Sequence, residues 1–128
     1  WLCRQIAGDG EGATRLLECC VTGAADHCTA KTVAKSIICS SLVKAAMFGA
    51  DANWGRVLCA IGYTPGDFDI SKTSVRLKSK AGEVFVCENA AYHPYMRRRP
   101  PWCSRRTRST SSWTLAAATP PPRPGAAT

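Results

Sequence analysis

The sequence has no apolar run long enough to cross a bilayer. Its longest apolar stretch, residues 42–48, is interrupted by Lys44, whereas a membrane-spanning helix needs about 20 predominantly apolar residues. The chain also lacks a charged segment followed by an apolar segment and a cleavage site, the pattern of a secretory signal, and it does not begin with Met. These absences exclude a membrane-spanning protein, and the first residue indicates a fragment or a processed chain.

Acidic residues are absent after Tyr95. Residues 96–128 contain seven Arg and no Asp, Glu or Lys, whereas residues 1–95 contain ten Lys or Arg and nine Asp or Glu. The formal net charge of +8 therefore belongs almost entirely to the tail. We interpret residues 1–95 as one folded unit with a small core, and residues 96–128 as a disordered tail rich in Arg, Pro, Ser and Ala.

The composition of this tail has two explanations. A basic arm is typical of nucleic-acid binding, so a basic-tailed nucleic-acid-binding module is one alternative function. Arg, Pro and Ala are also the residues that GC-rich codons encode when they are read out of frame. Synonymous codons can be chosen for residues 96–128 so that one base added after the Tyr95 codon opens a different reading frame. That frame encodes an acidic helix, an alternating strand and a Gly-rich turn. We therefore predict a frameshifted tail and no nucleic-acid partner.

Cysteine patterns typical of metal sites are missing. The eight cysteines include no C-x-x-C pair, and the group formed by Cys19, Cys20, His27 and Cys28 lacks a second ligand pair at zinc-finger spacing. Without a secretion signal, we expect reduced cysteines that are mostly buried. Neither His27 nor His93 lies in a recognisable triad context. We expect no metal and no resident cofactor.

The spacing of apolar residues predicts an α+β fold, with helices layered on a mixed or antiparallel sheet. Residues 42–48 fit either a helix or a strand. A cap is expected at Thr29 for one helix and at Asp51 or Asn53 for another. The expected helices are residues 1–7, 30–40 and 55–61, and the expected strands are residues 13–22, 75–78 and 83–87, the last two joined by a hairpin turn.

Polar residues gather in two places. In the first, Asp9 and Glu11 lie on a turn with three alternating glycines, residues 8–12, where two carboxylates could meet the ammonium group of a ligand. The alternative is a helix stop with solvent-exposed acids. Acidic side chains there would repel a phosphate, which argues against dinucleotide binding. In the second place, residues 48–56, we expect a helix cap, a buried Trp54 and an ion pair of Arg56.

Four segments together resemble the ornithine acetyltransferase family, which are glutamate N-acetyltransferases of the ArgJ type. The segments read RQIAGDGEGATRLLE, VAKSI, SSLVKAAMFGADANWGRVLCAIGY and GEVFVCEN, and with no large gap the resemblance covers residues 1–95. It implies that this chain is the C-terminal part of a β chain and an incomplete fragment of the ArgJ/DmpA-like fold. After the last segment, Asn89 and Ala90 depart from the glycine pair usual there.

The resemblance implies an acyltransferase of arginine biosynthesis. Members cut themselves before a threonine, which then carries an acetyl group from N-acetylornithine to glutamate and yields ornithine and N-acetylglutamate. Some members also use acetyl-CoA as the donor, so acetyl-CoA is a possible co-substrate. The implied assembly is a heterotetramer in which this β chain meets an α chain and a second β chain, in the cytoplasm or in a eukaryotic organelle.

Only one functional residue transfers to this chain through the resemblance. Glu11 matches the acidic substrate-binding position of the family. The nucleophilic threonine and the oxyanion-hole residues are expected outside this chain, and Thr14 lies within a predicted strand. We therefore expect no catalytic residue here and no activity of the chain alone. A non-catalytic subunit that docks on a separate α chain is the other alternative.

Overall fold

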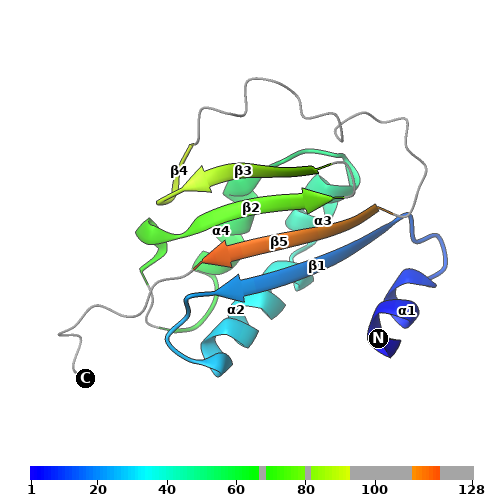
Figure 1. The fold of residues 1–128 in the computed structure, drawn as a ribbon, viewed down its shortest axis with the longest axis horizontal. Helices are drawn as coiled ribbons and strands as arrows, with labels where there is room; N and C mark the ends of the chain where they lie inside the picture. Colours follow the sequence, from blue (N-terminus) through cyan, green and yellow to red (C-terminus); the bar gives the residue numbers. More distant parts are fainter. Residues whose placement is uncertain (67–68, 80–81, 93–110, 119–128) are drawn as a thin grey trace.

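The computed structural model describes residues 1–66, 69–79, 82–92 and 111–118. These residues form one layer of helices on a five-stranded mixed sheet, with α2, α3 and α4 covering one face (Figure 1). The elements, in chain order, are α1 (Leu2–Gly8), β1 (Arg15–Thr22), α2 (His27–Cys39), α3 (Ser41–Phe48), α4 (Trp54–Gly62), the short 3-10 helix η1 (Ile70–Lys72), β2 (Ser74–Ser79), β3 (Gly82–Glu88), β4 (Ala91–Tyr92) and β5 (Ser111–Ala118). The predicted α+β class is confirmed.

The strands lie in the order β1-β5-β2-β3-β4. β5 runs parallel to β1 and antiparallel to β2, while β2, β3 and β4 form an antiparallel meander. Figure 1 shows α1 apart from the helical layer, near the beginning of β1. The segment that joins α1 to β1 therefore lies at one end of the sheet.

Local signals explain where most helices begin. α3 is a helix, which resolves the ambiguity of residues 42–48, and the Ser40 hydroxyl caps it by accepting from the Val43 N–H at 3.3 Å. α2 begins earlier than expected, because Asp26 and not Thr29 is its N-cap. The Asp26 carboxylate accepts from both the N–H and the hydroxyl of Thr29, each at 2.8 Å. A carboxylate at the N-cap also suits the positive end of the helix dipole.

The prediction of a disordered tail is wrong for residues 111–118, because these residues form β5 in the interior of the sheet. Strand pairing satisfies backbone N–H and C=O groups whatever the side chains are. The neighbouring strands β1 and β2 both pair with β5, and this pairing outweighs the missing strand period in the tail sequence. The other residues of the predicted tail lie outside the described residues.

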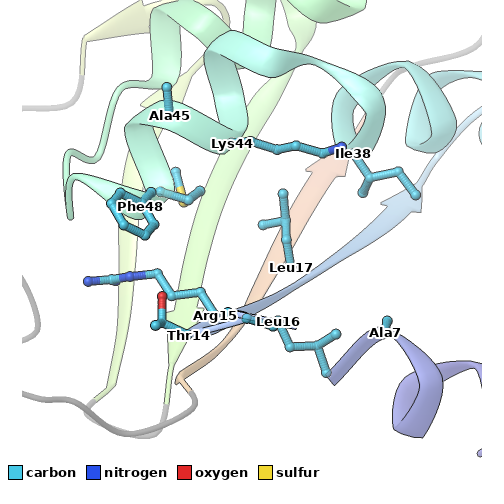
Figure 2. A pocket seen from close by; sticks show the side chains of 12 residues that line it. Ala7, Thr14, Arg15, Leu16, Leu17, Ile38, Lys44, Ala45 and Phe48 are labelled. Atoms are coloured by element: carbon cyan, nitrogen blue, oxygen red, sulfur yellow. The ribbon is translucent and has the colours of Figure 1, made fainter. Parts of the chain in front are cut away.

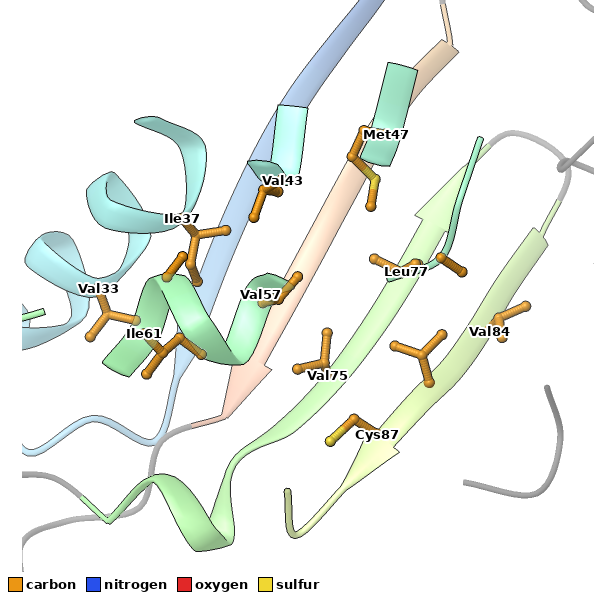
Figure 3. Packing of buried hydrophobic residues seen from close by; sticks show 13 residues of the cluster. Val33, Ile37, Val43, Met47, Val57, Ile61, Val75, Leu77, Val84 and Cys87 are labelled. Carbon is orange, nitrogen blue, oxygen red and sulfur yellow. The ribbon is translucent and has the colours of Figure 1, made fainter. Parts of the chain in front are cut away.

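The core fills the space between the helical layer and the sheet (Figure 3). Alternation places Val75 and Leu77 of β2 inside, and Arg76 between them outside. The helices contribute branched side chains that are fully buried: Val33, Ile37, Val43, Val57 and Ile61. Among the described residues, no helix is long and apolar enough to cross a membrane.

The expectation that the cysteines are mostly buried is wrong. The seven described cysteines form no disulfide with one another, and among them only Cys87 is fully buried. Cys39 and Cys59 are exposed, because the inward positions of their helices are occupied by larger branched residues such as Ile37 and Ile61.

Candidate functional site

The acidic turn predicted from the sequence joins α1 to β1. The N–H of Asp9 donates to the carbonyl of Gln5 at 2.9 Å and ends the helix, and the N–H of Ala13 donates to the carbonyl of Gly10 at 2.8 Å and closes the turn. Gly12 has a φ of +72°, which side-chain-bearing residues rarely adopt. Of the three glycines in residues 8–12, Gly12 is the one whose backbone requires glycine.

Glu11 stands exposed on this turn. It makes no hydrogen bond or ion pair with another described residue, whereas nearby Glu18 of β1 is paired with Arg4 of α1. The Glu11 carboxylate is therefore available to a cationic group from outside the described residues. Asp9 is also exposed, on the other side of the turn.

A hollow of about 630 Å³ lies directly beside the turn, between β1 and α3. Gly12, Ala13 and Thr14 form its rim next to Glu11, although Glu11 itself is not among the lining residues. Leu17 and Phe48 give it apolar walls (Figure 2). Its size is that of a small-molecule pocket.

Two cationic side chains, Arg15 and Lys44, also line this hollow. Figure 2 shows Arg15 extending from the start of β1 and Lys44 extending from α3 toward Ile38. A carboxylate on the turn, apolar walls and two cations together suit a ligand that combines an ammonium group, methylene groups and a carboxylate. An amino acid has this combination.

A second hollow, of about 560 Å³, lies on the other side of α1. Ile6 and Asp9 line it, and Leu16 lines both hollows. The two hollows are therefore neighbours, and the acidic turn lies at their boundary.

The second polar cluster, residues 48–56, has the structural role that the expected helix cap indicated. The Asn53 side-chain oxygen accepts from the Arg56 N–H at 3.2 Å and caps α4, while the Asn53 amide donates to Asp51 at 3.1 Å. Arg56 does not pair with a carboxylate as expected, because its guanidinium donates to the carbonyl of Leu42 at 3.1 Å. Trp54 is half-buried against the core. This cluster fixes α4 against α3.

The described residues offer no metal centre. They contain no group of three His, Cys, Asp or Glu side chains that could hold an ion. Burial is the main cause that raises the pKa of the Cys19 thiol to about 12, with a smaller contribution from Cys20, so Cys19 stays protonated at neutral pH. His27 is exposed at the start of α2, and His93 lies outside the described residues. The described residues thus give no support for a zinc site or a cysteine nucleophile.

Sequence reasoning identified the turn but not the hollow beside it. Ile38, Lys44 and Phe48 come from the end of α2 and from α3, and no spacing along the chain shows that they face β1. The available signal was Lys44, a single charge within an apolar stretch. Such a residue marks the exposed face of a helix whose opposite face is buried.

The fold is that of an α+β protein, with a surface hollow beside the acidic turn at one end of a mixed sheet. The model of the ArgJ family matches residues 1–101, and the chain belongs to this family. It is 52% identical over 94 residues to the Arginine biosynthesis bifunctional protein ArgJ of Caldanaerobacter subterraneus subsp. tengcongensis, covering 73% of this chain and 23% of that protein.

Two further relatives agree with this assignment. The chloroplastic Arginine biosynthesis bifunctional protein ArgJ of Ostreococcus lucimarinus is 61% identical over 62 residues, covering 48% of this chain and 13% of that protein. The crystal structure of the ArgJ protein from Bacillus halodurans superposes with a TM-score of 0.70 at 30% identity, covering 97% of this chain and 60% of that chain. The chain thus spans less than a quarter of the length of these curated relatives.

Proposed function

We propose that this chain is the C-terminal part of the β chain of an ArgJ-family acyltransferase in arginine biosynthesis. The proposed reaction moves an acetyl group from N-acetylornithine to glutamate and gives ornithine and N-acetylglutamate, with acetyl-CoA as a possible second donor. Membership of the ArgJ family supports this proposal, as do the names of the relatives.

The role of Glu11 is to bind the ammonium group of the substrate, which N-acetylornithine carries on its side chain because its α-nitrogen is acetylated. The observation that carries the proposal is the unpaired carboxylate of Glu11 on a turn whose next three residues line a hollow. A charge-assisted hydrogen bond between a carboxylate and an ammonium group is about twice as strong as a neutral one. The apolar walls beside it would hold the methylene groups of the substrate.

The reacting groups come from the rest of the protein. A threonine hydroxyl attacks the acetyl carbonyl of N-acetylornithine, the C–N bond breaks, and the proton of the hydroxyl goes to the departing amine of ornithine. The unprotonated amine of glutamate then attacks the carbonyl of the acetyl-threonine ester, the ester C–O bond breaks, and a proton of the amine returns to the threonine hydroxyl. Donors from the α chain stabilise the oxyanion of each step. This chain alone would therefore be inactive, and would act with an α chain and a second β chain.

The compartment follows the source organism. We infer a cytoplasmic location, or an organelle if the source is eukaryotic. The chloroplastic names of the relatives from Ostreococcus lucimarinus and Physcomitrium patens support the second case.

We also infer that residues 96–128 are read in a shifted frame. The family match ends at residue 101, and the Caldanaerobacter relative matches over 94 residues. The frame that one added base restores can encode an alternating strand that overlaps β5. An independent read of the coding DNA tests this inference, and a read without a missing base near the Tyr95 codon would contradict it.

A chimera tests the role of Glu11 in a complete protein. We define the chimera as the Caldanaerobacter relative with its 94 matching residues replaced by the corresponding residues of this chain. We expect Glu11→Gln to lower kcat/KM for N-acetylornithine by about 10- to 100-fold, because a hydrogen bond to a charged group is lost. Asp9→Asn, on the same turn, is the matched control. Equal effects of the two substitutions would refute the assignment.

A further inference from the structure

One ion pair joins the two elements that flank the acidic turn. Arg4 of α1 pairs through its Nε atom with the carboxylate of Glu18 on β1. Each of these residues lies seven positions from Glu11 in the sequence, one before it and one after it. The pair therefore closes residues 4–18 into a loop that has Glu11 at its middle.

The turn inside this loop has few other constraints among the described residues. None of the seven residues of α1 is buried, so little packing holds this helix against the sheet. Two backbone hydrogen bonds shape the turn itself, and their donors are the N–H groups of Asp9 and Ala13. The acceptors, Gln5 and Gly10, belong to the same segment. Local bonds of this kind fix the shape of the turn and not its position on the sheet.

The Arg4–Glu18 pair supplies such a constraint, because it links α1 to a strand. The backbone of β1 pairs with β5 over residues 15–22, so Glu18 is a fixed point on the sheet. An exposed ion pair contributes little to the stability of a protein. A small displacement of a binding group, however, can lower a reaction rate about 100-fold. The effect of this pair should therefore be larger on substrate binding than on unfolding.

We infer that Arg4 and Glu18 are positioning residues, which hold the turn where the Glu11 carboxylate meets the side-chain ammonium group of N-acetylornithine. The inference deepens the proposed function and rests on the role proposed there for Glu11. Neither Arg4 nor Glu18 contacts the substrate in this arrangement. Glutamate has no side-chain ammonium group, so the half-reaction of the donor depends on the position of the turn more than the half-reaction of the acceptor.

The chimera defined above tests the inference through the kinetics of the two half-reactions. Because the acetyl group passes through the threonine, kcat/KM for each substrate reports its own half-reaction. We expect Arg4→Met to lower kcat/KM for N-acetylornithine by about 3- to 10-fold, and to change kcat/KM for glutamate by less than about 2-fold. Arg4→Lys keeps the positive charge and should recover most of the loss.

Arg76→Met is the matched control. Arg76 has a side chain that is 58% exposed, close to the 60% of Arg4, and it also pairs with a carboxylate, that of Glu83 at 3.6 Å. This second pair joins β2 to β3, and β5 separates both strands from β1. Arg76→Met should therefore leave both kcat/KM values unchanged. Hydrogen exchange of residues 8–14, followed by mass spectrometry, should become faster in Arg4→Met and not in Arg76→Met.

A double-mutant cycle with Glu11→Gln separates positioning from direct contact. If Arg4 acts only through Glu11, Arg4→Met should have no further effect on kcat/KM for N-acetylornithine once Glu11 is replaced. Arg4 lines the second hollow, so a ligand there could reach it. An undiminished effect of Arg4→Met beside Glu11→Gln would show such a contact and overturn the inference.

Three other outcomes would also overturn it. Equal losses of kcat/KM for both substrates in Arg4→Met would indicate a general loss of structure. Equal effects of Arg4→Met and Arg76→Met would show that the location of the ion pair does not matter. If Glu11→Gln lowers kcat/KM and Arg4→Met does not, the positioning role fails while the proposed function stands. If Glu11→Gln has no effect, the proposed role of Glu11 fails, and the positioning role fails with it.

Discussion

The backbone N–H of Ala90 donates to the carbonyl oxygen of Thr73 at 2.9 Å. This bond ties the turn between β3 and β4 to the residue that precedes β2. Asn89 and Ala90 form the two-residue loop of that turn, and both have positive φ, 49° and 54°. Positive φ at both loop positions is the pattern of a type I′ hairpin, in which Asn-Gly is the preferred pair. Ala90 therefore occupies a position that favours glycine.

We expect Ala90→Gly to stabilise the chain by about 0.5–1 kcal/mol. The left-handed conformation costs a residue with a Cβ about 1–2 kcal/mol, and the greater freedom of glycine in the unfolded state offsets part of this gain. Urea unfolding measures the change. Ala91→Gly, in the adjoining strand β4, is the control and should destabilise the chain. If both substitutions destabilise it, the turn is not strained at Ala90.

Thr73 carries a buried hydroxyl without a hydrogen-bond partner among the described residues. Valine has nearly the same shape and no hydroxyl, so we expect Thr73→Val to stabilise the chain by about 1 kcal/mol. Thr64 is the matched control, because its buried hydroxyl donates to the carbonyl of Ala60 at 3.1 Å. Thr64→Val should destabilise by about the same amount. Loss of stability in both variants would show that the Thr73 hydroxyl has a partner.

The sequence predicted most of the elements in residues 1–92, because their periods are clear. The hairpin of β2 and β3 and the helix α4 with its Asn53 cap follow directly from alternation and capping residues. The beginning of α2 was misplaced because Asp26 and Thr29 are both good caps, and only their mutual hydrogen bonds show which one begins the helix. β5 was missed because its position depends on the open edges of two other strands and not on its own pattern.

For the candidate site, the sequence located the turn with Glu11 but not its surroundings. Glycines and acids are recognisable locally, and Gly12 does adopt the expected left-handed backbone. The approach of Lys44 and Phe48 to β1 results from the packing of α3 on the sheet, which no local signal encodes. The reacting groups are expected outside this chain, so neither its sequence nor its fold defines them.

The N-cap of α2, Asp26, predicts that the stability of the chain depends on pH. Two hydrogen bonds from Thr29 lower the pKa of the Asp26 carboxyl. The bond from the Thr29 N–H has the larger effect, and the bond from the Thr29 hydroxyl has the smaller one. When folding lowers the pKa of a carboxylate, its ionised form stabilises the fold. This stabilisation is fully present at pH values above the pKa of the unfolded state. It is lost as the pH falls through the pKa of the folded state. We expect Asp26→Ala to lower the unfolding temperature at pH 7, and the difference from the unchanged chain to shrink below about pH 4.

Asp26→Asn separates the cap from the charge. Asparagine can accept the same hydrogen bonds, so this variant should keep most of the stability at pH 7 and lose the dependence on pH. Thermal unfolding monitored by circular dichroism at several pH values measures both effects. A constant difference between Asp26→Ala and the unchanged chain from pH 3 to pH 7 would contradict the prediction.

The position of β5 leads to a prediction about the reading frame. Residues 111–118 read SSWTLAAA and pair with both β1 and β2 in the interior of the sheet. Alanine and serine are poor strand formers, whereas the strand that the restored frame can encode alternates and contains β-branched residues. We expect the chain with the restored frame to be more stable than this chain by about 1–3 kcal/mol, since several positions of an interior strand improve together.

Urea unfolding of three chains measures this difference: the chain as written, the frame-restored chain, and a chain that ends at Tyr95. The shortened chain should be the least stable, because β1 and β2 would lose the backbone hydrogen bonds that β5 supplies. If the frame-restored chain is no more stable than the chain as written, residues 111–118 are adequate for the interior position and the argument from β5 to a shifted frame fails.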